Sequence, residues 1–296
     1  MQQSLQLSLF NNNETVIKGN TKAINVSTVP QRSPFRYAGG KTWLVPTVRR
    51  WLNGEVDKLI EPFCGGGTVG LTAAAENLAN SIIMIEKDEE VAAVWEVIFS
   101  NSEWLIDKIL TFQMTHENVN KILHDEPKSI KELAFRTIIK NRTFHGGILA
   151  KGAGLIKQGE NGKGLTSRWY PVTIARRIKN IAANKCKIKF IRGDAFDYFS
   201  PDNYTQNTYY FIDPPYYTAG KRLYTLSDID HEDLFCCVSN LKCHFLLTYD
   251  KNDYILSLVE RHKLQWRTIP MQTTHLTKKY ELLISDNFKW LDNNMA

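Results

Sequence analysis

Hydrophobic and polar positions follow two alternating patterns along most of the chain. Short apolar runs bounded by turn residues predict strands, whereas apolar residues three and four positions apart predict amphipathic helices. Strands are expected at residues 58–63, 81–85, 187–192, 208–212, 243–248, 264–270 and 280–285. Helices are expected at residues 42–52, 91–100, 171–184, 231–241 and 254–261, with one more ending at Ala79 and two or three between 103 and 140. This order predicts an α/β fold with a mostly parallel sheet and one antiparallel edge.

The composition is that of an ordinary globular protein, with 43% hydrophobic and 23% charged residues among 296. No apolar run approaches the roughly 20 residues that span a bilayer, and no secretory signal is evident. The five cysteines include no C-x-x-C pair, and the histidines lack metal-ligand spacing. We therefore expect a cytoplasmic protein of one or two domains, without disulfides, a metal site or a membrane partner.

Positive charge is concentrated in one part of the chain. Residues 131–192 contain fifteen Lys and Arg against two Glu, so this block carries +13 and the remainder −7 within a net charge of +6. Inside it, residues 141–170 hold seven glycines among basic and aromatic residues, which is typical of a loop that lies on a phosphate backbone. The block predicts a nucleic-acid surface, whereas a merely solvated surface usually mixes both signs.

The first 33 residues are polar and show little periodicity, so we expect a flexible extension. Within it, the string from Gln6 to Phe10 (QLSLF) resembles the pentapeptide that binds bacterial sliding clamps. The resemblance implies a sliding clamp as a partner of this tail. The alternative is a short apolar segment that folds back on the domain.

The stretch Asp213-Pro214-Pro215-Tyr216 follows the strand at 208–212 directly. Two prolines end a strand abruptly, because neither can donate to a sheet ladder. The result is a stiff turn that carries one carboxylate and one aromatic ring at the carboxyl end of a strand, where α/β sheets bind ligands. Such a turn suits an amino group held in the plane of a stacked ring. The alternative is a strand-ending turn with no chemistry.

A glycine-rich loop follows the strand at 58–63. Gly65, Gly67 and Gly70 satisfy the G-x-G-x-x-G pattern, and Glu86 closes the next strand. Glycines let the backbone approach a cofactor, and an acid in this position commonly accepts hydrogen bonds from ribose hydroxyls. Together they predict an adenosine-containing cofactor, although Glu86 alone could be an exposed strand-end acid.

A second glycine turn, Gly39-Gly40-Lys41, precedes the helix at 42–52. A phosphate-binding P-loop is excluded, because Phe35 stands where that motif needs its first glycine and no strand precedes the loop. What remains is a turn that delivers an aromatic residue, Tyr37, and a lysine at a helix start, a shape suited to a carboxylate or another anion.

In this order, the motifs resemble the alpha-group adenine-N6 DNA methyltransferases, the DNA adenine methylase (Dam-like) family, from about residue 35 to residue 287. The resemblance implies a Rossmann-like methyltransferase sheet of seven strands whose last strand is antiparallel. It also implies a catalytic domain at residues 34–100 and 186–296, with an inserted, mainly helical target-recognition domain at 101–185. Two positions depart from close relatives, which often have tryptophan at Tyr37 and aspartate at Glu86.

Functional roles follow from the same resemblance. S-adenosyl-L-methionine is the implied cofactor, and its implied contacts are Tyr37, Lys41, Glu61, Phe63, Cys64, Gly65, Glu86, Asp194, Ala195 and Asp213. The implied catalytic residues are Asp213, Pro214 and Tyr216: the carboxylate and the Pro214 carbonyl would accept hydrogens from the N6 amino group of adenine, and the ring would stack on the base. Since the amino group cannot be reached inside a duplex, the base is expected to flip out.

The expected partner is double-stranded DNA, with a cognate restriction endonuclease as a further expectation in a bacterial or phage-encoded system. The basic residues predicted to contact DNA are Arg136, Lys140, Arg142, Lys151 and Arg168. Three alternatives stay open. An N4-cytosine methyltransferase usually has serine in place of Asp213, and a protein glutamine methyltransferase normally has asparagine there. A DNA-binding module without catalysis would have lost some of these side chains.

Overall fold

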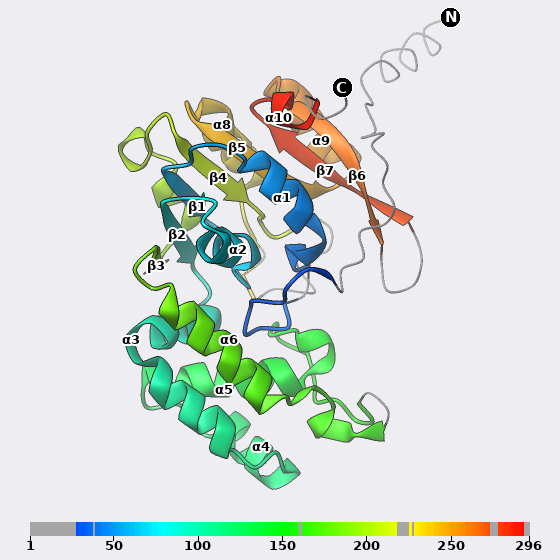
Figure 1. Ribbon diagram of the computed structural model, residues 1–296. Coiled ribbons are helices and arrows are strands. Elements are labelled where there is room, and N and C mark those ends of the chain that lie inside the picture. Colours follow the sequence, from blue (N-terminus) through cyan, green and yellow to red (C-terminus); the bar gives the residue numbers. More distant parts are fainter. Residues whose placement is uncertain are drawn as a thin grey trace, which may run out of the picture.

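The computed structural model describes residues 28–37, 39–159, 162–217, 225–226, 228–272 and 278–292. Within them, seven strands form one sheet in the order β3-β2-β1-β4-β5-β7-β6 (Figure 1). The strands are β1 (Lys58–Glu61), β2 (Ser81–Glu86), β3 (Ile188–Arg192), β4 (Thr208–Ile212), β5 (His244–Asp250), β6 (Gln265–Gln272) and β7 (Lys278–Ser285). The predicted α/β fold is confirmed. The clamp-like string from Gln6 to Phe10 lies outside the described residues.

Helices cover both faces of this sheet. The described helices are α1 (Val45–Trp51), α2 (Thr68–Glu76), α3 (Glu89–Thr111), α4 (His116–His124), α5 (Ile130–Thr143), α6 (Pro171–Ala183), α8 (His231–Asn240), α9 (Asp253–Arg261) and α10 (Lys289–Asp292). Along β1, Leu59 packs into the hydrophobic cluster of α1 and α2, and Ile60 packs into the cluster of α8 and α9. Because successive strand residues point to opposite faces, this division shows that the central strands are buried on both sides.

The last strand of the chain, β7, is the antiparallel one, as the sequence predicts, but it does not lie at the edge of the sheet. The strands β1 to β5 pair in parallel, and β7 pairs antiparallel with both β5 and β6. The antiparallel strand is therefore internal, and the edge strand β6 runs parallel to β5. The reason lies in burial. Leu282, Leu283 and Ile284 of β7 have no exposed surface, whereas β6 exposes the polar Gln265, so the more apolar strand takes the covered position.

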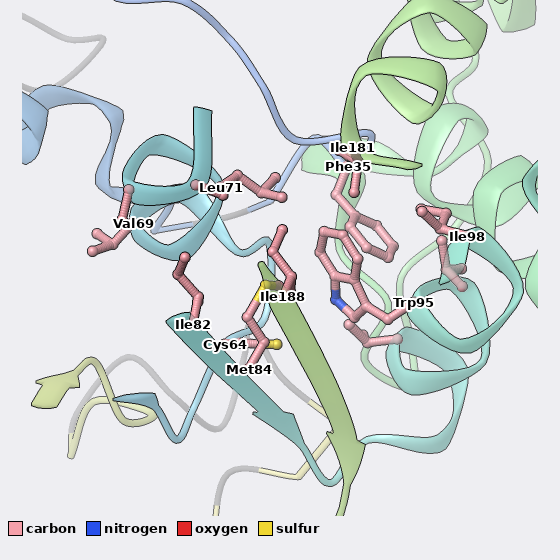
Figure 2. Packing of buried hydrophobic residues seen from close by; sticks show 14 of the residues in the cluster. Phe35, Cys64, Val69, Leu71, Ile82, Met84, Trp95, Ile98, Ile181 and Ile188 are labelled. Atoms are coloured by element: carbon pink, nitrogen blue, oxygen red, sulfur yellow. The ribbon is translucent and has the colours of Figure 1, made fainter. Parts of the chain in front are cut away.

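Between β2 and β3 the chain forms α3 to α6, which extend away from the sheet (Figure 1). These helices share a hydrophobic core with the sheet. Phe35 packs edge-on against Trp95 of α3 with ring centroids 5.6 Å apart, and Figure 2 shows Ile181 of α6 and Met84 of β2 beside this pair. A domain boundary at residues 101–185 stays a prediction, because α3 continues through that boundary with a kink at Asn101.

None of the described helices combines the length and the apolar character needed to cross a bilayer.

Candidate functional site

A cavity of about 440 Å³ lies at the carboxyl ends of the parallel strands. Its walls come from the loops after β1, β2, β3 and β4, from the glycine turn with Tyr37, Gly40 and Lys41, and from residues 147–149 after α5. This is the edge at which open α/β sheets bind ligands. The structure brings together all ten positions predicted to bind a cofactor, since each of them lines the cavity: Tyr37, Lys41, Glu61, Phe63, Cys64, Gly65, Glu86, Asp194, Ala195 and Asp213.

The glycine loop after β1 needs its glycines for two physical reasons. Gly65 has a φ of +46°, and a Cβ atom there would lie 2.7 Å from the ring of Tyr37. At Gly70 a Cβ atom would lie 2.6 Å from the Glu61 carboxylate. Residues with a side chain rarely adopt positive φ, and neither neighbour leaves space for one. The glycines therefore let the loop and the Tyr37 ring form one continuous wall of the cavity.

Two carboxylates, the buried Glu61 and the half-buried Glu86, hold this loop. Glu61 Oε2 accepts a hydrogen bond from the Gly70 amide at 2.8 Å. Glu86 accepts from the Gly65 amide at 2.8 Å through Oε2 and from the Asp88 amide at 2.8 Å through Oε1. Burial raises the pKa of Glu61 to about 8 and the pKa of Glu86 to about 7, although the amide donors oppose the shift. The structure therefore buries Glu61 and half-buries Glu86 at the loop, which disfavours the alternative of Glu86 as an exposed strand-end acid.

The turn after β4 presents its carboxylate in a fixed orientation. Asp213 Oδ1 lies 2.7 Å from Lys41 Nζ and accepts a hydrogen bond from Thr248 Oγ1 at 2.7 Å. Two donors therefore converge on one oxygen, which leaves Oδ2 as the acceptor for a ligand. Asp213 and Pro215 line the cavity, whereas Pro214 and Tyr216 are outside its lining.

The Tyr216 ring lies directly behind the lysine. Lys41 Nζ is 4.9 Å from the centre of this ring, and the Tyr216 hydroxyl donates to Glu281 Oε1. The ring is half-buried and packs at 6.1 Å from the ring of Tyr249. The predicted catalytic turn is thus tied to the lysine of the glycine turn and to β7.

Sequence reasoning missed two residues of this site, Thr248 and Glu281. Thr248 is a single polar residue at the end of an apolar run, which is a weak signal. Glu281 carried a stronger one, because a charged residue that enters a strand of buried Leu and Ile demands a partner.

The basic residues predicted to contact DNA separate into two groups. Lys140 Nζ lies 2.6 Å from Glu90 Oε2, and Arg136 lies 3.9 Å from the same carboxylate. Arg142 is buried and donates to the Pro34 carbonyl, and burial lowers the pKa of its guanidinium to about 10. These three side chains have contacts inside the protein, and their contacts with DNA stay a prediction.

The second group lies between α5 and α6. Lys151 is exposed, and Arg168 lines a second cavity of about 360 Å³ together with His145 and Lys157. These two positions keep the predicted access to a phosphate backbone.

A buried amide ties α5 to the wall of the cavity. The Asn141 side chain of α5 accepts from the Arg36 amide at 2.8 Å and donates to the Arg36 carbonyl at 3.0 Å and the Gly147 carbonyl at 2.8 Å. Arg36 precedes Tyr37, and Gly147 is itself part of the cavity wall. A Cβ atom at Gly147 would lie 2.4 Å from the Arg36 carbonyl, so the two segments touch closely.

Replacing this amide should destabilise the fold. We expect Asn141→Leu to lower the free energy of unfolding by about 2–4 kcal/mol, because three buried backbone groups lose their partner. Urea unfolding followed by circular dichroism measures the change. The control is Asn184→Ala, which loses one amide contact at the end of α6 and should cost less than about 1 kcal/mol. Equal losses in both variants would contradict the role given to Asn141.

The strand order and the glycine loop define a Rossmann-like fold of the methyltransferase type, in which the antiparallel β7 lies between β5 and β6 in an otherwise parallel sheet. Residues 37–152 match the family model described as D12 class N6 adenine-specific DNA methyltransferase. The matched stretch is similar to that family and includes the glycine turn, the glycine loop after β1, and Glu86.

Solved structures of other methyltransferases are similar to the chain at low sequence identity. The rRNA methyltransferase aviRa from Streptomyces viridochromogenes is 10% identical, with a TM-score of 0.38 over 94% of this chain and 99% of that one. Precorrin-6y C5,15-methyltransferase from Geobacter metallireducens is 11% identical, with a TM-score of 0.32 over 81% and 84%. No curated protein matches the chain.

Proposed function

We propose that the enzyme transfers a methyl group from S-adenosyl-L-methionine to the N6 amino group of an adenine flipped out of duplex DNA. One observation carries the proposal. Lys41 and Thr248 occupy Oδ1 of Asp213, so Oδ2 is the oxygen that can accept a hydrogen from an amino group in the cavity. A carboxylate with one oxygen available in this way can accept a hydrogen bond from an amino group, such as the N6 amino group of adenine.

The cavity supports the cofactor assignment on its own geometry. Glu86 is fixed by two backbone amides, and its remaining lone pairs can accept from a ribose diol. A Cβ atom at Gly65 would clash with the Tyr37 ring, so this wall of the cavity depends on glycine. Tyr37 would contact the methionine end, and Asp194 with Ala195 would flank the adenine ring of the cofactor.

The Asp213 carboxylate and the Pro214 backbone carbonyl would make the adenine amine a better nucleophile. The exocyclic nitrogen of adenine is a poor nucleophile, because its lone pair is delocalised into the ring. Asp213 Oδ2 and the Pro214 carbonyl would each accept one of its hydrogens, which favours a pyramidal nitrogen whose lone pair is free to attack. Tyr216 would stack on the base and hold it in register. When bound, the cofactor supplies an activated methyl group on its sulfonium.

The substrate would reach the cavity as a flipped nucleotide, because its amino group is inaccessible inside a duplex. Lys151 and Arg168 would hold the phosphate backbone on the side of the insertion. The insertion at residues 101–185 would thus act as the recognition domain. N4-methylation of cytosine is the second candidate, since both reactions methylate an exocyclic amine.

The class of substrate is tested by competition between macromolecules. Tritiated S-adenosylmethionine is incubated with the enzyme and equal masses of duplex DNA, total RNA and a mixed protein extract, which are then separated. We expect label in DNA alone. Label confined to RNA or protein would contradict the proposal.

A further inference from the structure

Glu281 is a buried acid that the proposed reaction does not use. It lies on β7, where its backbone pairs with Asp250 of β5 and Ile269 of β6. Only 2% of its surface is exposed. Burying a carboxylate costs several kcal/mol unless the group is paired. Such a residue needs compensating contacts.

Its contacts lead to the catalytic turn. Glu281 Oε1 lies 3.4 Å from Lys41 Nζ and accepts the Tyr216 hydroxyl. Lys41 is itself buried, with 3% exposure, and its ammonium lies between Glu281 and the closer Asp213 at 2.7 Å. One cation is therefore shared by two carboxylates, one from the turn after β4 and one from β7.

The second oxygen of this carboxylate is unusual. Glu281 Oε2 is buried and has no hydrogen-bond partner among the described residues. Burial raises the pKa of Glu281, with Lys41 opposing the shift and Asp213 adding to it. The side-chain contacts of Glu281 among the described residues therefore all go through Oε1, toward Lys41 and Tyr216.

We propose that Glu281 is a positioning residue that acts on the reaction through Lys41 and Tyr216. If Lys41 had Asp213 as its sole counter-ion, it would draw the negative charge of that carboxylate to itself and weaken Oδ2 as an acceptor. Sharing the ammonium with Glu281 leaves more of that charge for the amine. The hydroxyl contact fixes the tilt of the Tyr216 ring on which the base would stack. This inference rests on the proposed function.

The test uses Glu281→Gln, which keeps the shape and an acceptor for Tyr216 but removes the negative charge. We expect kcat for transfer of label to DNA to fall about 10- to 100-fold. The KM for the cofactor and the Kd for S-adenosylhomocysteine should change less than about threefold, because Glu281 is outside the cavity lining. An unchanged kcat would overturn the inference.

The control is Ser285→Ala, four residues along the same strand. Ser285 donates a buried hydrogen bond to the Phe245 carbonyl at 2.8 Å and is not part of the cavity lining. We expect this variant to melt at a lower temperature and to keep the kcat of the native enzyme. If Glu281→Gln behaves in the same way, its role is structural and the inference fails.

A double-mutant cycle separates positioning from a remote effect. In the Tyr216→Phe background the hydroxyl contact is already lost, so Glu281→Gln should reduce kcat by a factor at least about threefold smaller than in the native background. Fully additive losses would contradict the coupling. Because kcat is measured as total label in DNA, label found in cytosine would overturn the proposed function and leave this test intact.

Discussion

Asp213→Asn should lower kcat by about 10³-fold or more while the Kd for S-adenosylhomocysteine changes less than about threefold. The structure explains why an isosteric amide fails. Lys41 and Thr248 both donate to Oδ1, so the amide would turn its oxygen toward them and its NH₂ group toward the substrate. A donor would then face the amino group that needs an acceptor.

Calorimetric titration with S-adenosylhomocysteine and steady-state transfer of label to DNA measure the two quantities. The matched control is Asp286→Asn. Asp286 accepts from the Phe245 amide at the opposite end of β5, and its variant should stay within about threefold of the native kcat. Near-native turnover by Asp213→Asn would refute the role of Oδ2.

The unliganded protein should become less stable as the pH rises from about 5 to about 8. Burial raises the pKa of Glu61 to about 8, whereas the unfolded chain has the ordinary value of about 4.5. Between these values the folded state keeps a proton that the unfolded state has released, so each increase in pH favours unfolding. Glu86, with a pKa raised to about 7, acts in the same direction.

Glu61→Gln should remove much of this dependence. The amide keeps an oxygen for the Gly70 amide and carries no charge to bury, so the variant should be more stable than the native protein at pH 8 by on the order of 2–4 kcal/mol. Urea unfolding at pH 5, 6.5 and 8 measures the slope. The control is Glu103→Gln at an exposed position of α3, which should keep the native slope. A native protein that gains stability toward pH 8 would contradict this explanation.

The strands could be predicted because each is a local pattern. An apolar run such as Thr208–Ile212, closed by two prolines, fixes its own ends, and the glycine loop before Thr68 fixes the start of α2. Motif order also located the cavity, since parallel strands place their carboxyl ends on one edge. The position of β7 between β5 and β6 could not be predicted from a local pattern. It depends on a comparison of β6 with β7, of which the more apolar strand takes the internal position.

Side-chain pairing was the part that the sequence did not reveal. The contacts of Lys41 with Asp213 and Glu281 join segments far apart in the chain, and no local pattern encodes them. The sequence showed that residues 131–192 are basic, but not which of these side chains point to solvent and which into the protein. Arg142 and Lys151 have the same sign of charge, yet one is buried against a carbonyl and the other is exposed.

The central claim is that the methyl group reaches N6 of adenine. It is tested most directly by digesting labelled duplex DNA to nucleosides and separating them by chromatography. We predict that the tritium co-elutes with N6-methyladenine, and that Asp213→Asn removes this peak. Tritium in N4-methylcytosine would contradict the claim.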